Sequence, residues 1–158
     1  MTAPNKERAE AHGWVERVAE AEGFSRRLAG VRPGGGDEEV VLDLVTPEAA
    51  PFAVALVAET LARRGDGARL WVLCEEARDQ DRVHAELGVW GFSALYLPRL
   101  SAAEEGLADP DVLAERAAVL EAWRRAGSGN GGAAVLVLGA DGLAEAAPAA
   151  PVFAQTED

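Results

Sequence analysis

The stretch that decides the fold runs from Val40 to Pro51 and reads VVLDLVTPEAAP. Its first half, Val40 to Val45, is short, apolar and rich in β-branched residues, which predicts a strand covered on both faces. Pro47 and Pro51 are incompatible with a continuing strand, but they suit a turn and the first turn of a helix. The residues that follow, Phe52 to Arg64, have the composition of a helix, so strand, turn and helix are predicted in that order.

The turn at Thr46–Pro51 occupies the place where α/β proteins bind ligands, between the carboxyl end of a strand and the start of a helix. It contains no glycine that would let the backbone approach an anion, and it contains no lysine. Glu48 would also repel a phosphate group. We interpret the turn as a phosphate-loop position that has lost its chemistry, and we predict no cofactor and no cofactor-binding residue.

Further strands and helices alternate downstream, so the predicted fold class is α/β with a parallel sheet of about four strands and helices on both faces. This is a degenerate P-loop-like arrangement of three layers, with a helical N-terminal extension. A strand, a helix and a strand in succession predict parallel neighbours, here Val40–Val45 and Arg69–Cys74. The other predicted strands and helices are Ala94–Leu97, Ala134–Leu138, Arg78–Trp90 and Asp109–Ala126.

The N-terminal residues Lys6 to Ala29 have a helical pattern, which Gly23 is expected to break into two helices. Apolar residues recur at helical spacing on one side, at Ala11, Trp14, Val15, Val18 and Ala21. We favour a helix that packs its Trp14 side on the domain. The alternative is a docking helix for another chain.

The chain has 158 residues, enough for one domain with a substantial core. A run of glycines separates the helical N-terminal part from the α/β part, and the last residues are acidic. The predicted organisation is a helical extension at 1–31, a Gly-rich linker at 32–39, an α/β domain at 40–153 and an acidic tail at 154–158.

Charge and cysteine content narrow the function classes. The formal net charge of −12 disfavours broad contact with nucleic acid or anionic lipid, since phosphate contacts need lysine and arginine. Cys74 is the single cysteine, which excludes an internal disulfide and favours a reducing compartment. No apolar run approaches the roughly 20 residues of a membrane span. We therefore expect a cytoplasmic domain with weak or no direct nucleic-acid binding and no membrane association.

The residues with possible chemistry have simpler structural interpretations. Glu75 and Glu76 follow a predicted strand and suit a ribose or a metal, but acidic residues also favour the start of the next helix. We expect His12 and His84 to be structural or solvated, and Cys74 to be a small buried apolar side chain. No serine or cysteine has an evident base partner at recognisable spacing. We predict no catalytic and no metal-binding residues, and we assign no partner-binding residue.

Several local patterns occur in a characteristic order over residues 24–151. They are FSRRL at 24–28, the turn and helix at 46–59, the strand and helix at 70–75 and 79–87, YLP at 96–98, DPD at 109–111 with AERAAVL at 114–120, and the strand at 135–143 followed by Pro148. In this order they resemble the N-terminal domain of the bacterial transcription-repair coupling factor, which is itself similar to excinuclease B.

The resemblance implies a non-catalytic scaffold or interaction domain that acts in transcription-coupled nucleotide excision repair. In that family the ATP-dependent DNA translocase motor lies elsewhere in the chain. Ala50 and Pro51 stand at the places of the nucleotide-site lysine and hydroxyl residue, so this domain is not expected to bind ATP or to be an enzyme. The DNA-gripping aromatics of excinuclease B are absent. The expected partners are proteins, excinuclease A or RNA polymerase, reached through the parent protein.

Two other interpretations remain open. The stretch from Val41 to Leu44, followed later by Glu75, is similar to S-adenosylmethionine-dependent methyltransferases, in which an acid after the second strand binds ribose. On this interpretation Asp43 belongs to the first motif, but Val45, Pro47 and Ala49 stand where glycines should approach the cofactor. The domain would then be a degenerate relative of those enzymes. The remaining alternative is an acidic α/β protein-interaction module with no role in repair.

Overall fold

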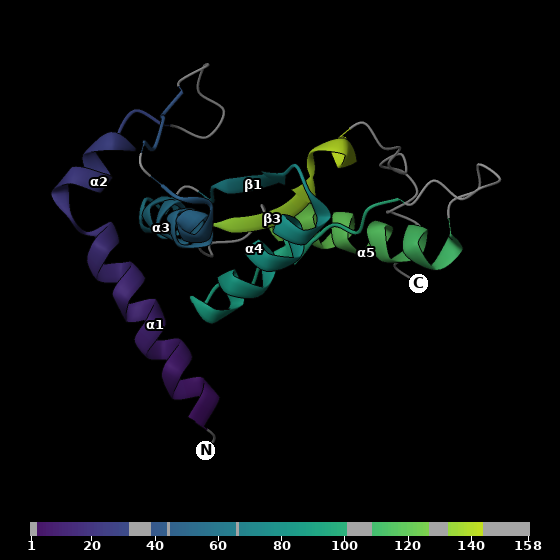
Figure 1. Cartoon of the computed structure of the whole chain (residues 1–158), viewed down its shortest axis with the longest axis horizontal. Helices are drawn as coiled ribbons and strands as arrows, with labels where there is room; N and C mark the ends of the chain where they lie inside the picture. Colours follow the sequence, from purple (N-terminus) through teal and green to yellow (C-terminus); the bar gives the residue numbers. More distant parts are fainter. Residues whose placement is uncertain are drawn as a thin grey trace.

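A computed structural model describes residues 3–31, 39–43, 45–65, 67–100, 109–126 and 133–143 (Figure 1). The helices are α1 (Ala3–Ala19), α2 (Glu22–Arg27), α3 (Ala50–Arg63), α4 (Ala77–Val89) and α5 (Pro110–Ala126). The strands are β1 (Arg69–Cys74), β2 (Leu95–Tyr96) and β3 (Ala134–Gly139). Two short 3-10 helices complete the described structure, η1 (Pro47–Ala49) and η2 (Ala140–Leu143).

The described strands form a three-stranded parallel sheet in the order β1-β3-β2. Arg69 of β1 is opposite Ala134 of β3, and Cys74 is opposite Gly139 at the other end of the pair. On the other side of β3, Leu95 is opposite Leu136. The apolar sequence AVLVLG suits this central position, because a strand with neighbours on both sides and helices on both faces has no polar face. The predicted α/β class with a parallel sheet is confirmed.

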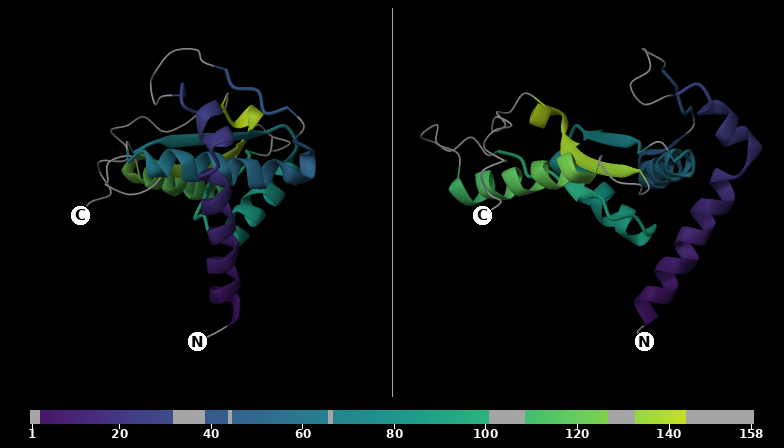
Figure 2. Two further views of the ribbon diagram at one scale, coloured as in Figure 1. Left: turned by 90° about the vertical axis from the view of Figure 1, so that its left-hand side faces the viewer. Right: turned by 180° about the vertical axis from the view of Figure 1, so that it is seen from behind.

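Alternate residues of β3 enter two separate cores. Val135 and Val137 belong to a core that includes residues of α1, α3 and α4. Leu136 and Leu138 pack on the opposite face with Leu97 and with Trp123 of α5. Helices therefore cover both faces of the sheet, as predicted, with α1, α2 and α3 at one end of the molecule and α5 at the other (Figure 2).

The predicted strand at Val40–Val45 is wrong for the residues that the structure describes there, 39–43 and 45–46, which are in no strand. The sheet has three described strands rather than about four, and the predicted parallel pairing of this stretch with β1 is absent. Val41 and Val45 are exposed, whereas the pattern predicted burial on both faces. The physical reason is that β-branched residues favour a strand only where a neighbouring strand and a packed face receive them.

Helix α1 packs against α3 through Val15 and Ala19, which are buried. Val15 and Val18 of the predicted apolar stripe pack in or against the main core, but the prediction is wrong for Trp14, whose side chain is 61% exposed. The Arg17 guanidinium lies 4.5 Å from the centre of the Trp14 ring, so a cation–π contact covers part of the ring instead. The first turns of α1 project beyond the rest of the molecule (Figures 1 and 2).

The ends of several helices follow from local chemistry. Gly65 has a φ of 68° and follows the end of α3, because only glycine adopts this conformation readily. Asp109 accepts a hydrogen bond from the Asp111 backbone N–H at 2.9 Å, which caps the start of α5. None of the described helices is both long enough and apolar enough to cross a bilayer. Most of the predicted linker at 32–39, Pro148 and the predicted tail at 154–158 lie outside the described residues.

Candidate functional site

The turn before α3 is the first place to look for a ligand, because parallel sheets bind ligands where strands end and helices begin. Thr46 is extended, with φ −72° and ψ 156°, and Pro47–Ala49 form η1, which leads directly into α3. A proline lies in the first turn of α3, and no side chain caps this helix. The backbone is therefore a tight proline-containing bend, rather than the open glycine loop that surrounds a phosphate.

Glu48 supplies a negative charge of its own at this helix start. A hydrogen bond from its own backbone N–H lowers the pKa of the Glu48 carboxyl, and the Thr46 side chain and the nearby Arg82 lower it further. Arg82 of α4 also donates to the Pro47 carbonyl oxygen at 2.9 Å. The protein's own carboxylate thus receives the stabilisation that a helix start offers to a bound anion.

The Arg99 side chain lies at the carboxyl ends of the strands and forms hydrogen bonds there. Its Nε donates to Oε1 of Gln80 at 3.0 Å, and Gln80 is completely buried on α4. The Arg99 Nη2 donates to the carbonyl oxygens of Cys74 and Glu75, at 3.3 and 3.2 Å, where β1 ends. The Nη1 donates to Oδ2 of Asp141 in η2 at 3.2 Å. One guanidinium therefore joins the residues after β1, β2 and β3 to the start of α4.

Gly139 makes room for this arrangement at the end of β3. A Cβ at this position would lie 2.7 Å from Cζ of Arg99 and 2.4 Å from Oδ1 of Asp141. Both distances are shorter than ordinary Cβ contacts, so a side chain at this position would force the Arg99 guanidinium and the Asp141 carboxylate to shift. Gln80 completes the cluster by donating from Nε2 to the Leu97 carbonyl oxygen at 2.7 Å. The space at the strand ends is occupied by the protein's own side chains.

The sequence did not reveal Arg99 as a central residue, since it stands after Pro98 at the start of an irregular stretch. Its partners come from four separated parts of the chain, and two of them are backbone carbonyl groups that no sequence pattern marks. A glutamine on the core side of a predicted helix was the one available signal. A buried glutamine needs polar partners, so such a residue points to a nearby donor and acceptor.

The acidic pair after β1 does not converge on a site. Glu75 and Glu76 are both exposed, and Glu76 is the residue from which α4 begins. Its carboxylate lies 4.0 Å from Arg78, a contact between two well-exposed side chains. The helix-start interpretation of these acids therefore agrees with the structure. Asp43, the other acid of the methyltransferase interpretation, is exposed in a turn.

The histidines and the cysteine have structural positions. His12 Nδ1 lies 3.3 Å from the Trp90 carbonyl oxygen, and His84 Nε2 lies 3.1 Å from the Ala94 carbonyl oxygen. Cys74 is buried in the core shared with α3 and α4, and burial raises the pKa of its thiol. Within the described part of the chain, no cluster of three or more His, Cys, Asp or Glu side chains is arranged to hold a metal ion.

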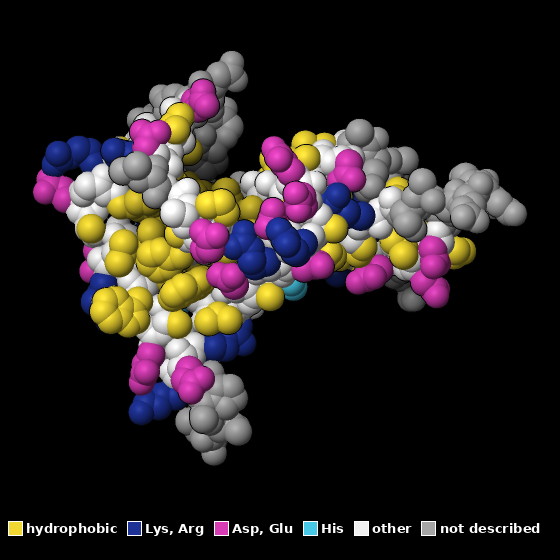
Figure 3. Space-filling view, viewed as in Figure 1, with side chains coloured by type: hydrophobic (Ala, Val, Ile, Leu, Met, Phe, Trp, Pro, Cys, Tyr) yellow, Lys and Arg dark blue, Asp and Glu magenta, His cyan; other side chains and the backbone are white. Residues whose placement is uncertain are grey.

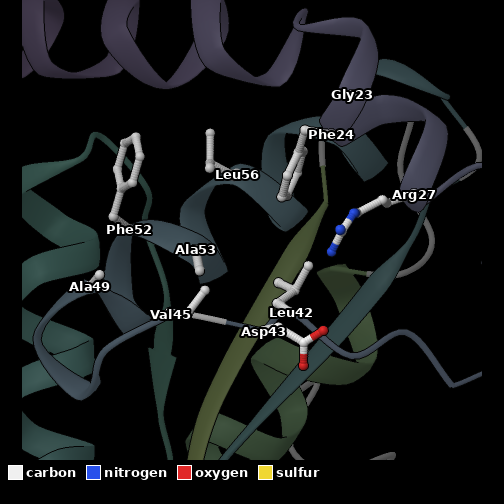
Figure 4. Close-up of a pocket in the computed structure, with 10 residues that line it drawn as sticks. All are labelled: Gly23, Phe24, Arg27, Leu42, Asp43, Val45, Ala49, Phe52, Ala53 and Leu56. Carbon is white, nitrogen blue, oxygen red and sulfur yellow. The ribbon is translucent and has the colours of Figure 1, made fainter.

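A cavity of about 440 Å³ opens between α2, residues 42–45 and α3 (Figure 4). Phe24, Phe52 and Leu56 line it from the helices, and Arg27 extends from α2 toward the stretch that holds Asp43. The wall is apolar apart from these two charged side chains. Hydrophobic side chains also gather on the surface over α1 and α3 (Figure 3). This end of the molecule therefore offers apolar contact area without the convergent polar groups of a catalytic pocket.

Comparison with known proteins adds no relative, since no family model, no curated protein and no solved structure matches the chain. The resemblance to the coupling-factor domain therefore stays a prediction from the sequence.

Proposed function

We propose that this chain is a non-catalytic protein-interaction domain that serves transcription-coupled nucleotide excision repair. The observation that supports a non-catalytic role is Arg99, which fills the carboxyl edge of the sheet with bonds to Gln80, Asp141 and the end of β1. Glu48 adds a negative charge at the start of α3, where a nucleotide phosphate would otherwise be attracted.

The proposed role in protein interaction is supported by apolar surface that stays exposed. Apolar side chains are exposed on β1, and an apolar cavity opens beside α3. Exposed apolar area of this kind is typical of surfaces that bind other proteins. The repair pathway is proposed from the sequence alone, because the order of the motifs resembles that of the coupling factor. Excinuclease A and RNA polymerase are therefore the partners to test.

The methyltransferase alternative has less support. Its ribose-binding acid would be Glu75, whose carbonyl oxygen accepts a hydrogen bond from Arg99 and whose side chain is exposed. The cofactor would also have to approach Glu48 and the proline-containing bend, where no glycine opens the backbone. In a domain that binds S-adenosylmethionine, the cofactor has to come close to the backbone at this position.

Calorimetric titration with magnesium ATP and with S-adenosylmethionine tests the non-catalytic role. We expect no binding by the wild-type chain and none by Glu48→Gln, because Arg99 still closes the strand ends when the Glu48 charge is removed. Micromolar binding of either compound to the wild-type chain would overturn the proposal.

Capture experiments with purified excinuclease A and purified RNA polymerase test the pathway. We expect the chain to retain one of these partners, with the unfolded chain in urea-treated samples as the negative control. Failure with both partners would remove the repair assignment. The interaction role without a repair partner would then be the interpretation to pursue.

A further inference from the structure

Among the described residues, strand β1 lies at an edge of the sheet, and the backbone groups on its outer side can be identified residue by residue. Its one described neighbour is β3, and the Ala134 N–H donates to the Ala68 carbonyl oxygen at 3.0 Å. In a parallel ladder this bond places the even-numbered residues of β1 in the bonds to β3. The backbone N–H and C=O groups of Trp71 and Leu73 therefore point to the side of β1 on which no strand lies among the described residues, called the free edge below. A free edge of this kind is a template for an added strand.

The side chains of these two residues also lie outside the core. Trp71 is 47% exposed and Leu73 is 51% exposed, on the side of the sheet where Trp71 meets the ring of Trp123 in α5. Leu70 and Val72 point to the other side and pack against the main core. A strand added at the edge would place alternate side chains beside Trp71 and Leu73 and cover them.

On the other face of the sheet, residues of α3 and β1 line a groove together. The groove has a volume of about 300 Å³ and runs along residues 70–73 of β1. Residues 42 and 45 form its outer wall. The α3 residues that line it share a single helical stripe, with the spacing i, i+3, i+4 and i+7, and are Ala50, Ala53, Val54 and Val57. This stripe is an apolar floor for a strand that β1 lacks.

The carboxyl end of the groove is acidic. Glu75 and Glu76 are exposed directly after β1. Glu48 is exposed two residues before Ala50, which lines the groove. At the opposite end, β1 begins with Arg69. The charges therefore favour an occupant with a cationic residue next to Glu75.

We propose that an extended segment of a protein partner binds along the free edge of β1 as a fourth strand, with apolar side chains on the α3 stripe and a cationic residue beside Glu75. Main-chain hydrogen bonds to Trp71 and Leu73 provide affinity, and the alternating side chains provide specificity. This inference rests on the proposed interaction function and names its surface and the chemistry of its partner.

A second copy of this chain fits the edge poorly. A two-fold axis would pair β1 with β1 of the other copy in antiparallel order and would keep the same face of both sheets aligned. Each copy would then bring its own α3 beneath the same two strands. Because the α3 stripe already lies under the position of the added strand, the two helices would occupy the same volume. A single extended segment has no such helix.

The probe is a blocked peptide of about eight residues, in which valine and threonine alternate and two lysines form one end. Its matched control has glutamates in place of the lysines. Two versions, with the lysines first or last, determine the direction of the added strand. Hydrogen exchange of backbone amides, followed by NMR in the whole chain, reports on the edge directly. We expect the Trp71 and Leu73 amides to exchange at least about tenfold faster than those of Leu70 and Val72 in the free chain, and to slow when the lysine peptide binds.

Variants at Leu73 test whether the peptide binds at the edge of β1 or elsewhere on the surface. Leu73→Pro removes one edge N–H without removing a bond to β3, and Leu73→Lys places a charge against the cationic peptide. We expect each to weaken peptide binding about tenfold or more, and the second variant remains informative if the first fails to fold. Leu143→Lys changes an equally exposed leucine, at 54% exposure, away from the edge and should leave binding unchanged.

Four results would overturn the proposal. Edge amides that are already protected in the dilute free chain would mean that the chain's own residues cover β1. Protection that rises with protein concentration, together with dimers in sedimentation, would assign the edge to a second copy. Peptide binding that is equal in wild type and Leu73→Lys would place the peptide elsewhere. If Leu73→Lys still captures a repair partner, the edge of β1 is not the binding site of that partner, but the proposed interaction function stands. If the wild-type chain captures no partner, that result counts against the interaction function itself.

Discussion

Replacing Arg99 with alanine tests whether the closed edge of the sheet holds the fold together. The guanidinium donates to Oε1 of Gln80 at 3.0 Å and to two carbonyl oxygens at the end of β1. Gln80 is fully buried while Arg99 is in place, so its side-chain oxygen loses a charged donor at a buried position when the arginine is removed. The remaining contact, to Asp141, joins Arg99 to an exposed carboxylate.

The magnitude follows from these contacts. A buried acceptor left without a donor costs about 1–3 kcal/mol, and the lost bonds from a charged donor to the Cys74 and Glu75 carbonyl groups add to it. The exposed pair with Asp141 contributes below about 1 kcal/mol, because solvent screens it. We expect Arg99→Ala to lower the free energy of unfolding by about 2–4 kcal/mol. Arg99→Lys should lose nearly as much, since an ammonium group cannot span Gln80 and both carbonyl groups.

Urea denaturation followed by tryptophan fluorescence and by circular dichroism measures this loss. Arg78→Ala is the matched control, because Arg78 is an exposed arginine whose nearest carboxylate is 4.0 Å away, and it should change stability by less than about 0.5 kcal/mol. A loss below about 1 kcal/mol for Arg99→Ala, or one equal to that of Arg78→Ala, would refute the reasoning.

A double-mutant cycle with Gln80→Leu identifies the source of the effect. If Arg99 acts through the buried amide oxygen, the combined variant should lose less than the sum of the two single losses, by about 1–2 kcal/mol. Additive losses would show that the two side chains do not depend on one another, in spite of their 3.0 Å contact.

Three further predictions concern stability, thiol reactivity and ionisation. Leu87→Ala should cost about 2–5 kcal/mol in urea denaturation because Leu87 is fully buried, whereas Leu113→Ala should change stability by less than about 0.5 kcal/mol because Leu113 is exposed. Burial raises the pKa of the Cys74 thiol, so a thiol reagent should react at least about tenfold more slowly with the native chain than with the chain in urea. Burial, and then a hydrogen bond to Asp81, raises the pKa of Tyr96 to about 12, which an ultraviolet titration of this single tyrosine measures directly. Because the pKa is higher in the folded chain, the contribution of Tyr96 to stability is complete below about pH 10 and is lost as the pH rises toward 12, and Tyr96→Phe should remove this dependence.

Much of the secondary structure could be predicted because local signals mark it. Asp109 and Pro110 define the start of α5, and Gly65 ends α3. The strand predicted at Arg69–Cys74 has the same limits as β1, and the one at Ala134–Leu138 is one residue shorter than β3. In each case apolar and β-branched residues are bounded by glycine or by the start of a helix. Such signals act over a few residues, so they need no knowledge of the tertiary structure.

The errors arise where a segment depends on a distant neighbour. Val40–Val45 has the composition of a buried strand, but its described residues are not in the sheet. Helix α1 presents Val15 and Ala19 to α3 rather than Trp14, although both sides of the helix carry apolar residues. Composition reveals that a face is apolar, but the partner decides which apolar face becomes buried.

The residue types of the turn could be seen in the sequence, but the interactions of Arg99 could not. The missing glycine and lysine of the turn were visible in the sequence, because ligand chemistry requires particular residue types there. The contribution of Arg99 was not visible, since it bonds to backbone carbonyl groups and to side chains that folding brings together. The residue types that a turn lacks are therefore easier to read from the sequence than the interactions that form around it.

The sequence RLWVLC of β1 carries the most consequential difference between prediction and structure. From Leu70 to Cys74 it is apolar, as in a strand with neighbours on both sides, but β3 is the one described strand beside it. If the sequence were adapted to an exposed edge, polar or charged residues would be expected in place of Trp71 and Leu73, because they discourage unwanted strand pairing. Apolar residues at these two positions are instead what an edge needs when another strand covers it. The mismatch between the sequence and its exposed position is thus the physical reason to look for the partner at β1.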